Sequence, residues 1–298
     1  MTFFFRAILF VTSLFPALIE GQALKPRTVW FDESCRNNPN VEVDKLWGII
    51  QQMKADAQDN ARVPVGKLYE HIFKDSNNAA FISATLNAIS NDLVATKDEA
   101  NTLIFCDEDA RFKVATDEEA KCKNSQRTKK LIIDRVSDIV YDGHTLCSKT
   151  VGRATMGGTY CNNKLNDEKR CSITLCKDGI FFKSTQRRGG LYRFQEGNTD
   201  FSIDDGAAES GPLIDNWNLL DTVILHEITH TIHNEDAQPF PMWIDVGYEW
   251  NGVKDLYAAQ AKQNADSMAY FGLGSWIQKS ASQGPYRVLK SGSIKKGQ

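Results

Sequence analysis

The feature that most constrains the fold is an apolar segment that carries three of the chain's five histidines. It contains the pattern His226-Glu227-Ile-Thr-His230, in which the first and last residues are four positions apart. Residues at i and i+4 lie on the same face of a helix, so a helical segment would direct both imidazoles to one point. The segment is therefore predicted to be a helix that presents two histidines together.

The residues around this pattern also predict a helix. Asp215 is a candidate N-cap, because an aspartate oxygen can accept a hydrogen bond from a free backbone N–H at a helix start. The apolar positions that follow it are Trp217, Leu219, Leu220, Val223, Ile224 and Ile228.

Two imidazoles at this spacing can bind one Zn²⁺ at about 2.0–2.1 Å each. Glu227 directly follows the first histidine and can reach a zinc-bound water as general base. The pattern is short, and the alternative is an amphipathic helix with histidines on its surface. The concentration of histidine in this segment and an aspartate downstream favour metal binding.

A catalytic zinc usually has three protein ligands and one water. After the predicted helix, Pro239 and Pro241 exclude helical continuation and can turn the chain back toward the metal. This turn would let Asp245 coordinate through a carboxylate oxygen. Tyr248 could then donate its hydroxyl to an oxyanion on the substrate carbonyl, although a half-buried loop aromatic is an equally good interpretation.

Two neighbouring residues offer alternatives. Glu249 could compete with Asp245, because zinc accepts either carboxylate. His233 is seven residues after His226 and returns to nearly the same helix face, where it could be an auxiliary ligand. We favour an exposed His233 near the helix C-terminus, since the HExxHxxGxxH extension is absent.

The first 23 residues predict a secretory signal peptide. Arg6 precedes an apolar run over residues 7–19 that is short for a membrane span, and Gly21-Gln-Ala23 suits cleavage after Ala23. The alternative is an uncleaved N-terminal anchor. We expect a secreted, extracellular protein with no membrane association once the signal is removed.

All seven cysteines lie beyond this segment. In an oxidising compartment they indicate disulfides first and metal ligands second. Seven is odd, so at least one thiol is free or pairs between chains. The formal net charge of −3 gives no support for nucleic-acid binding, which needs a basic patch.

Residues 24–298 are predicted to form one α+β domain, with the catalytic motifs in 215–279. Apolar periodicity predicts helices at 43–61, 67–73, 77–94, 253–262 and 265–279. Asn264 stands where the N-cap of the last helix belongs. Short runs predict strands at 131–133, 138–141, 171–175 and 179–182, in a region rich in cysteine. The segment 29–31 is expected to be extended and fastened by a disulfide through Cys35.

The order of motifs resembles the aspzincin metallopeptidases, the deuterolysin-like and peptidyl-Lys endopeptidase group of secreted fungal enzymes. After HExxH come Asp245-Val-Gly-Tyr248 and Asn264-Ala-Asp-Ser-Met-Ala-Tyr-Phe271, within roughly the last third of the chain. The resemblance implies zinc on His226, His230 and Asp245, with Glu227 as base and Tyr248 as transition-state donor. It also implies a zincin fold, mostly helical with a small sheet beside the metal helix.

The loop departs from the family pattern Gly-Thr-x-Asp-x-x-Tyr-Gly. Met242 and Trp243 replace Gly-Thr, and Glu249 replaces the closing glycine. The expected function is a secreted zinc metalloendopeptidase that acts as a monomer on protein or peptide substrates. Because the loop is altered, the alternative is a secreted zinc-binding or interaction protein on a zincin scaffold with little or no protease activity.

Overall fold

The computed structural model describes residues 24, 26–39, 41–64, 67–122, 131–136, 140–142, 147, 157–162, 170–176, 213–232, 243–279 and 285–297. The predicted signal peptide, the expected strand at 179–182 and His233 lie outside these residues. The described part combines helices, three sheets and three disulfides, which confirms the α+β class and a small disulfide-linked sheet. The single domain over 24–298 stays a prediction.

One sheet of the described residues has five strands, in the order β2-β1-β3-β8-β7. Its first four members run parallel to one another, and β7 at the edge is antiparallel to β8. Parallel strands are usually covered on both faces, and β3 is buried at every position. The strands are β1 (Arg27–Phe31), β2 (Ile89–Leu93), β3 (Thr102–Phe105), β7 (Gly157–Asn162) and β8 (Arg170–Leu175).

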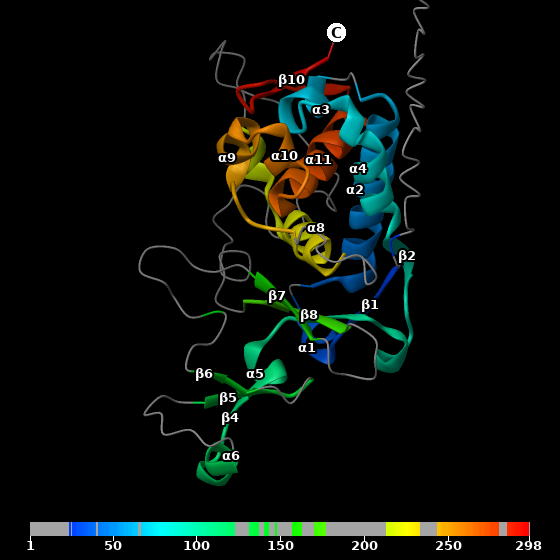
Figure 1. Ribbon diagram of the computed structural model, residues 1–298. Coiled ribbons are helices and arrows are strands. Elements are labelled where there is room, and N and C mark those ends of the chain that lie inside the picture. The colour runs from blue at the N-terminus through cyan, green and yellow to red at the C-terminus, as the bar shows by residue number, and fades with distance from the viewer. Residues whose placement is uncertain are drawn as a thin grey trace, which may run out of the picture.

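Helices cover one face of this sheet (Figure 1). In the figure, α2 (Val43–Arg62), α8 (Leu220–Thr231) and α11 (Ala265–Lys279) lie together above the sheet, and α8 contacts β7 and β8. The histidine-bearing helix α8 is therefore enclosed by the sheet on one side and by two longer helices on the other.

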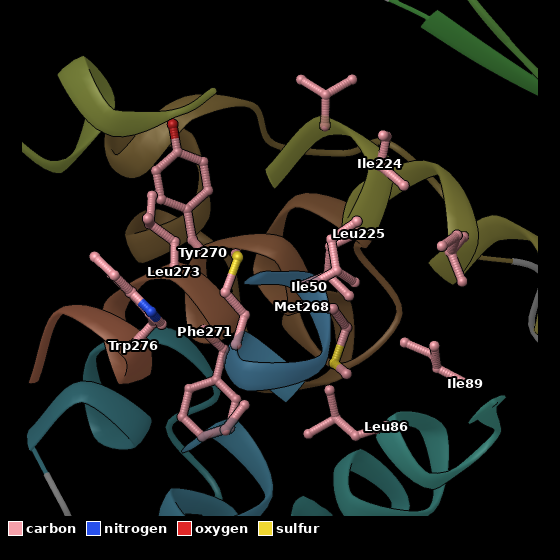
Figure 2. Packing of buried hydrophobic residues seen from close by; sticks show 14 of the residues in the cluster. Ile50, Leu86, Ile89, Ile224, Leu225, Met268, Tyr270, Phe271, Leu273 and Trp276 are labelled. Carbon is pink, nitrogen blue, oxygen red and sulfur yellow. The ribbon is translucent and has the colours of Figure 1, made fainter. Parts of the chain in front are cut away.

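The centre of the core lies where these helices meet (Figure 2). Ile50 of α2, Leu225 of α8 and Phe271 of α11 are all fully buried there. Burying one such side chain stabilises the fold by about 1.5–3 kcal/mol. Gly272 lets α11 approach α8 closely, because a Cβ at this position would lie 2.5 Å from Leu225 Cδ2.

Three of the five predicted helices appear with nearly the expected bounds, as α2, α3 (Lys67–Ile72) and α11. The helix predicted over 253–262 is divided into α9 (Glu249–Asp255) and α10 (Ala258–Ala261). The break falls at Leu256 and Tyr257, which are both extended. Tyr257 and Gln260 then form a capping box that starts the second helix.

The helix predicted over 77–94 is wrong in its second half. A 3₁₀ turn η1 (Ser76–Asn78) leads into α4 (Ala79–Asn87), and the chain then forms β2. The apolar residues of this segment are shared between a helix and a strand, although their spacing is compatible with one helix.

Tertiary contacts explain the change from helix to strand. Strand β2 pairs with β1 on one side, and side chains of α2 bind its carbonyl groups. Trp47 Nε1 donates to Asn91 O at 2.9 Å, Gln51 Nε2 to Ser90 O at 2.9 Å and Lys54 Nζ to Ile89 O at 2.8 Å. These three helix residues cover the edge of the sheet, which leaves it less available for pairing with another chain.

Two smaller sheets complete the described fold. β4 (Phe112–Val114), β5 (Leu131–Asp134) and β6 (Val140–Asp142) form one, and β9 (Tyr286–Val288) with β10 (Ile294–Lys296) forms the other. The predicted strands at 131–133, 138–141 and 171–175 correspond to β5, β6 and β8. The remaining short elements are α1 (Glu33–Arg36), η2 (Lys97–Glu99), α5 (Glu108–Arg111), α6 (Asp117–Cys122) and η3 (Ile214–Trp217).

A buried arginine joins the β4–β6 sheet to the main sheet. Arg111 donates through Nη1 to Ser172 O at 3.1 Å and through Nη2 to Asp134 Oδ2 at 3.2 Å. Both charged side chains are almost fully buried. Removing one partner of a buried ion pair leaves an unpaired charge and strongly destabilises a protein. This pair therefore fixes how the two sheets attach.

Three disulfides are present: Cys35–Cys106, Cys147–Cys176 and Cys161–Cys171. The first fastens the segment after β1, as expected for Cys35. The seventh cysteine is Cys122, whose side chain lies outside those described. Within the described residues, no helix has both the length and the apolar character needed to cross a bilayer.

Candidate metal centre

Helix α8 presents His226 and His230 on one face, as predicted. Their Nε2 atoms are 3.1 Å apart, and eleven of the helix's residues are buried.

The expectation that Asp215 caps this helix is wrong. Asp215 lies in the separate turn η3, and α8 begins after Leu219 with no side-chain cap. Asp215 Oδ1 accepts hydrogen bonds from Trp250 N at 2.7 Å and Tyr270 Oη at 2.5 Å instead.

Asp245 completes a three-residue group with these histidines. Its Oδ1 lies 3.1 Å from His230 Nε2 and 3.3 Å from His226 Nε2. Around a tetrahedral zinc with bonds of about 2.0–2.1 Å, ligand atoms are separated by about 3.3 Å. The three residues therefore form a group that could hold a metal ion. His226 is buried, His230 is half-buried and Asp245 is exposed, so the group is accessible from one side.

The start of α11 holds the loop that carries Asp245. Asn264 Oδ1 accepts from Val246 N at 2.9 Å and from Gly247 N at 3.1 Å, and its Nδ2 donates to Gly247 O at 3.0 Å. Asn264 stands at the helix start as predicted, but its side-chain oxygen binds this loop.

A Cβ at Gly247 would lie 2.6 Å from Gly252 O, so the turn requires glycine. Pro239 and Pro241, which were expected to turn the chain, lie outside the described residues.

Each histidine is oriented by its second ring nitrogen. The Nδ1–H of His226 donates to Asp266 Oδ1 at 2.6 Å, and the Nδ1–H of His230 donates to Trp243 O at 3.2 Å. Both bonds leave Nε2 free to act as a ligand, and such partners commonly orient metal-binding histidines. Asp266 belongs to the Asn264–Phe271 motif, but the sequence alone indicated no role for it. The available clue was an acidic residue two positions after Asn264, the predicted N-cap of the last helix.

The charges around the group favour a cation. Burial lowers the pKa of His226, but the bond to Asp266 and the nearby carboxylates of Glu227 and Asp245 outweigh it and raise this pKa to about 9. Burial raises the pKa of Asp245, and the bond to His230 with the charge of both histidines brings it below its ordinary value. The site therefore stabilises positive charge, whether a proton or a metal ion supplies it.

Glu227 is buried beside the histidines, where strand β7 contacts its side chain. Thr159 Oγ1 donates to Glu227 Oε2 at 2.6 Å. Sequence reasoning missed Thr159, because it lies 68 residues before Glu227 and belongs to no local pattern. Only the packing of α8 on the sheet brings the two side chains together.

Tyr248 is exposed and stands over His226. Its side chain is 53% exposed, and its ring stacks on the His226 ring with centroids 6.4 Å apart and planes at 20°. Its hydroxyl hydrogen-bonds to Asp245. Burial and the neighbouring carboxylates, Asp245 foremost, raise the pKa of Tyr248, so the hydroxyl keeps its proton at neutral pH. Tyr248 therefore lies at the metal group with a proton to donate.

Glu249 does not join the group, and Asp245 is the carboxylate that faces the two histidines. Glu249 has a φ of 60°, in the left-handed region where an ordinary residue costs about 1–2 kcal/mol. Its backbone N donates to Asp266 Oδ2 at 3.0 Å. The aspzincin pattern has glycine here, which suits this backbone without that cost.

No protein-family model matches this chain. No curated protein is significantly similar to it either. The motif order and the geometry of the metal group are therefore the observations from which a function is argued.

Proposed function

We propose that this chain is a secreted zinc metalloendopeptidase of the aspzincin type, built on a zincin fold. The observation that carries the proposal is the convergence of His226, His230 and Asp245 beside the buried carboxylate of Glu227. A metal-storage site needs the three ligands, but it does not need an acid–base group next to them.

The donor set supports zinc. Two imidazole nitrogens and one carboxylate oxygen, with one side accessible, match the three-ligand arrangement of catalytic zinc sites. Bound at this point, zinc would lower the pKa of a water molecule and polarise the scissile carbonyl.

The protein's own residues would carry the proton and stabilise the developing charge. Glu227 takes a proton from the attacking water and later passes it to the leaving amine. Tyr248 donates its hydroxyl to the oxyanion of the tetrahedral intermediate after releasing Asp245. Strand β7, at the edge of the described sheet, offers backbone groups to which an extended peptide can add as a further strand.

Secretion is part of the same proposal. Three disulfides fit an oxidising compartment, and the N-terminal segment has the pattern of a signal peptide.

The test is cleavage of a denatured protein substrate by the wild type and by Glu227→Gln, with bound zinc measured in both. The variant is expected to keep stoichiometric zinc and to lose hydrolysis. Glu70→Gln, on the exposed side of α3, is the matched control and is expected to cleave normally. Full activity of Glu227→Gln would reject the assignment.

The bond between Tyr248 and Asp245 favours a second candidate, a secreted zinc-binding protein with little or no protease activity. In that arrangement the hydroxyl is occupied and serves the metal group. Stoichiometric zinc without any chelator-sensitive cleavage would support this function over the first.

A further inference from the structure

Strand β7 lies beside the Glu227 carboxylate, with a different residue near each of its two oxygens. Thr159 Oγ1 lies 2.6 Å from Oε2 and 3.0 Å from the backbone oxygen of Glu227. Glu227 is only 6% exposed, and Thr159 is the hydrogen-bond donor to its carboxylate among the described residues. The Thr159 hydroxyl therefore holds Oε2 in place.

The second oxygen lies next to a glycine. A Cβ at Gly157 would be 3.4 Å from Glu227 Oε1 and 3.2 Å from Thr174 O. Gly157 and Thr159 are two residues apart in a strand, so they belong to the same face of β7. One position supplies a hydroxyl to Oε2, and the other leaves the space beside Oε1 without a side chain.

We infer that β7 gives the two oxygens of Glu227 separate tasks: Thr159 fixes Oε2, and Gly157 keeps Oε1 accessible to the attacking water. This inference rests on the proposed hydrolase function. The proton moves from water to Oε1 while the water oxygen bonds to the carbonyl carbon. It then moves from Oε1 to the amine nitrogen as the C–N bond breaks. Thr159 is thus a positioning residue, because its side chain acts through Glu227 and not on the reacting atoms.

The strand is fixed firmly enough for this role. Cys161, two residues after Thr159, is bonded to Cys171 at the directly opposite position of β8. Cys171 Sγ also lies 4.0 Å from Thr231 O, at the end of α8. The disulfide therefore ties β7 to β8 close to the helix that carries Glu227.

Thr159→Val tests the positioning role, because it replaces the hydroxyl with a methyl group of similar size. We expect kcat to fall between about 10- and 100-fold, with KM and zinc stoichiometry unchanged. Thr159→Ser is expected to restore most of kcat. An unchanged kcat in Thr159→Val, or loss of its zinc, would overturn the inference.

Gly157→Ala tests the other oxygen. Its methyl group would occupy the space next to Oε1, so we expect kcat to fall while zinc remains bound. Gly48→Ala is the matched control, since a Cβ at this exposed position of α2 would meet no atom within 4 Å. A Gly157→Ala enzyme as active as this control would contradict a role for the open space.

Crystal structures of the zinc-loaded wild type and Thr159→Val separate this inference from the proposed function. If the wild type cleaves nothing, the hydrolase proposal fails, and the orientation of Glu227 still decides the role of Thr159. A single carboxylate orientation in the wild type that changes in the variant supports the inference. The same orientation in both proteins rejects it.

Discussion

At the scale of single residues, Asp266 connects two parts of the metal centre. Its Oδ1 accepts a hydrogen bond from His226 Nδ1–H, and its Oδ2 accepts one from the backbone N–H of Glu249, next to Tyr248. One buried carboxylate thus orients a metal ligand and fixes the loop that carries the tyrosine.

Asp266→Asn is expected to weaken zinc binding by about 10- to 100-fold, because an amide oxygen is a weaker acceptor for His226. Competition with a fluorescent chelator measures the affinity. Asp255→Asn is the matched control, since this carboxylate is 73% exposed and pairs only with Lys254 among the described residues. Equal affinities in the two variants would show that Asp266 does not support the metal site.

A second aspartate is buried without full hydrogen bonding. Asp221, in the first turn of α8, accepts two bonds from Thr222 at Oδ1, whereas Oδ2 has no partner among the described residues. Burial raises the pKa of Asp221 from 3.8 to about 7, although the bonds from Thr222 oppose the shift. Because the folded pKa is the higher one, Asp221 contributes stability below pH 3.8 that is lost as the pH rises through 7.

Asp221→Asn is therefore expected to stabilise the protein at pH 8, by about 1–3 kcal/mol, because the amide is neutral. Near pH 4 the variant and the wild type should be almost equally stable. Urea unfolding at the two pH values measures the difference. A wild type that is no less stable at pH 8 than the variant would contradict the argument.

At the scale of elements, the contact between α8 and α11 sets the position of the histidines. Gly272→Ala would place a methyl group 2.5 Å from Leu225 Cδ2 and push the two helices apart. We expect a loss of about 1–3 kcal/mol of stability, together with weaker zinc binding.

Gly48→Ala is the control, because a Cβ at this exposed position of α2 would meet no atom within 4 Å. It is expected to stabilise the helix by about 0.5–1 kcal/mol. Thermal unfolding and a zinc titration distinguish the two variants. Similar effects from both would show that the close helix approach is unimportant.

Some helices and strands could be predicted from the sequence, and others could not. The helices α2 and α11 were predictable, since each has a sustained apolar stripe and a long uninterrupted run. The strand β2 was not, because the residues that make it a strand are Trp47, Gln51 and Lys54 of another helix and the backbone of β1. Local periodicity contains no information about such distant partners.

At the scale of the whole molecule, a bound metal would join helix α8 to the loop that carries Asp245, and more distant elements support both. His226 belongs to α8, Asp245 to a loop held by α11, and Glu227 is positioned by β7. Binding to the folded state alone should stabilise all of them together. At free zinc of about 100 times Kd, the expected gain in unfolding free energy is about 2.7 kcal/mol.

This gain should depend on pH. Without metal, the proton on His226 contributes stability below pH 6.5 that is lost as the pH rises through about 9. Zinc must displace that proton, so binding at pH 7.5 should release about one proton from His226, in addition to the proton lost by a zinc-bound water. The contribution of His226 should disappear as the pH rises well above 9, so total release should fall by about one proton. Calorimetric titrations in buffers of different ionisation enthalpy measure it. Proton release that does not change with pH would contradict the raised pKa.

The residues of the candidate metal group could be selected from local patterns in the sequence. The spacing of His226 and His230 on a helix, and the Asp245 and Tyr248 that follow, were predictable because each depends on local chain geometry or on motif order. The structure brings His226, His230 and Asp245 to within metal-binding distance, with Tyr248 over His226. Their roles in catalysis stay predictions.

The groups that orient these residues become visible only when the chain is folded. Asp266 lies 40 residues from His226, and Thr159 lies 68 residues from Glu227. Hydrogen bonds of this kind depend on how α8, α11 and β7 pack in space. A helix that presents two histidines is therefore predictable from local periodicity, whereas the groups that orient its imidazoles and its carboxylate arise from contacts made only in the complete fold.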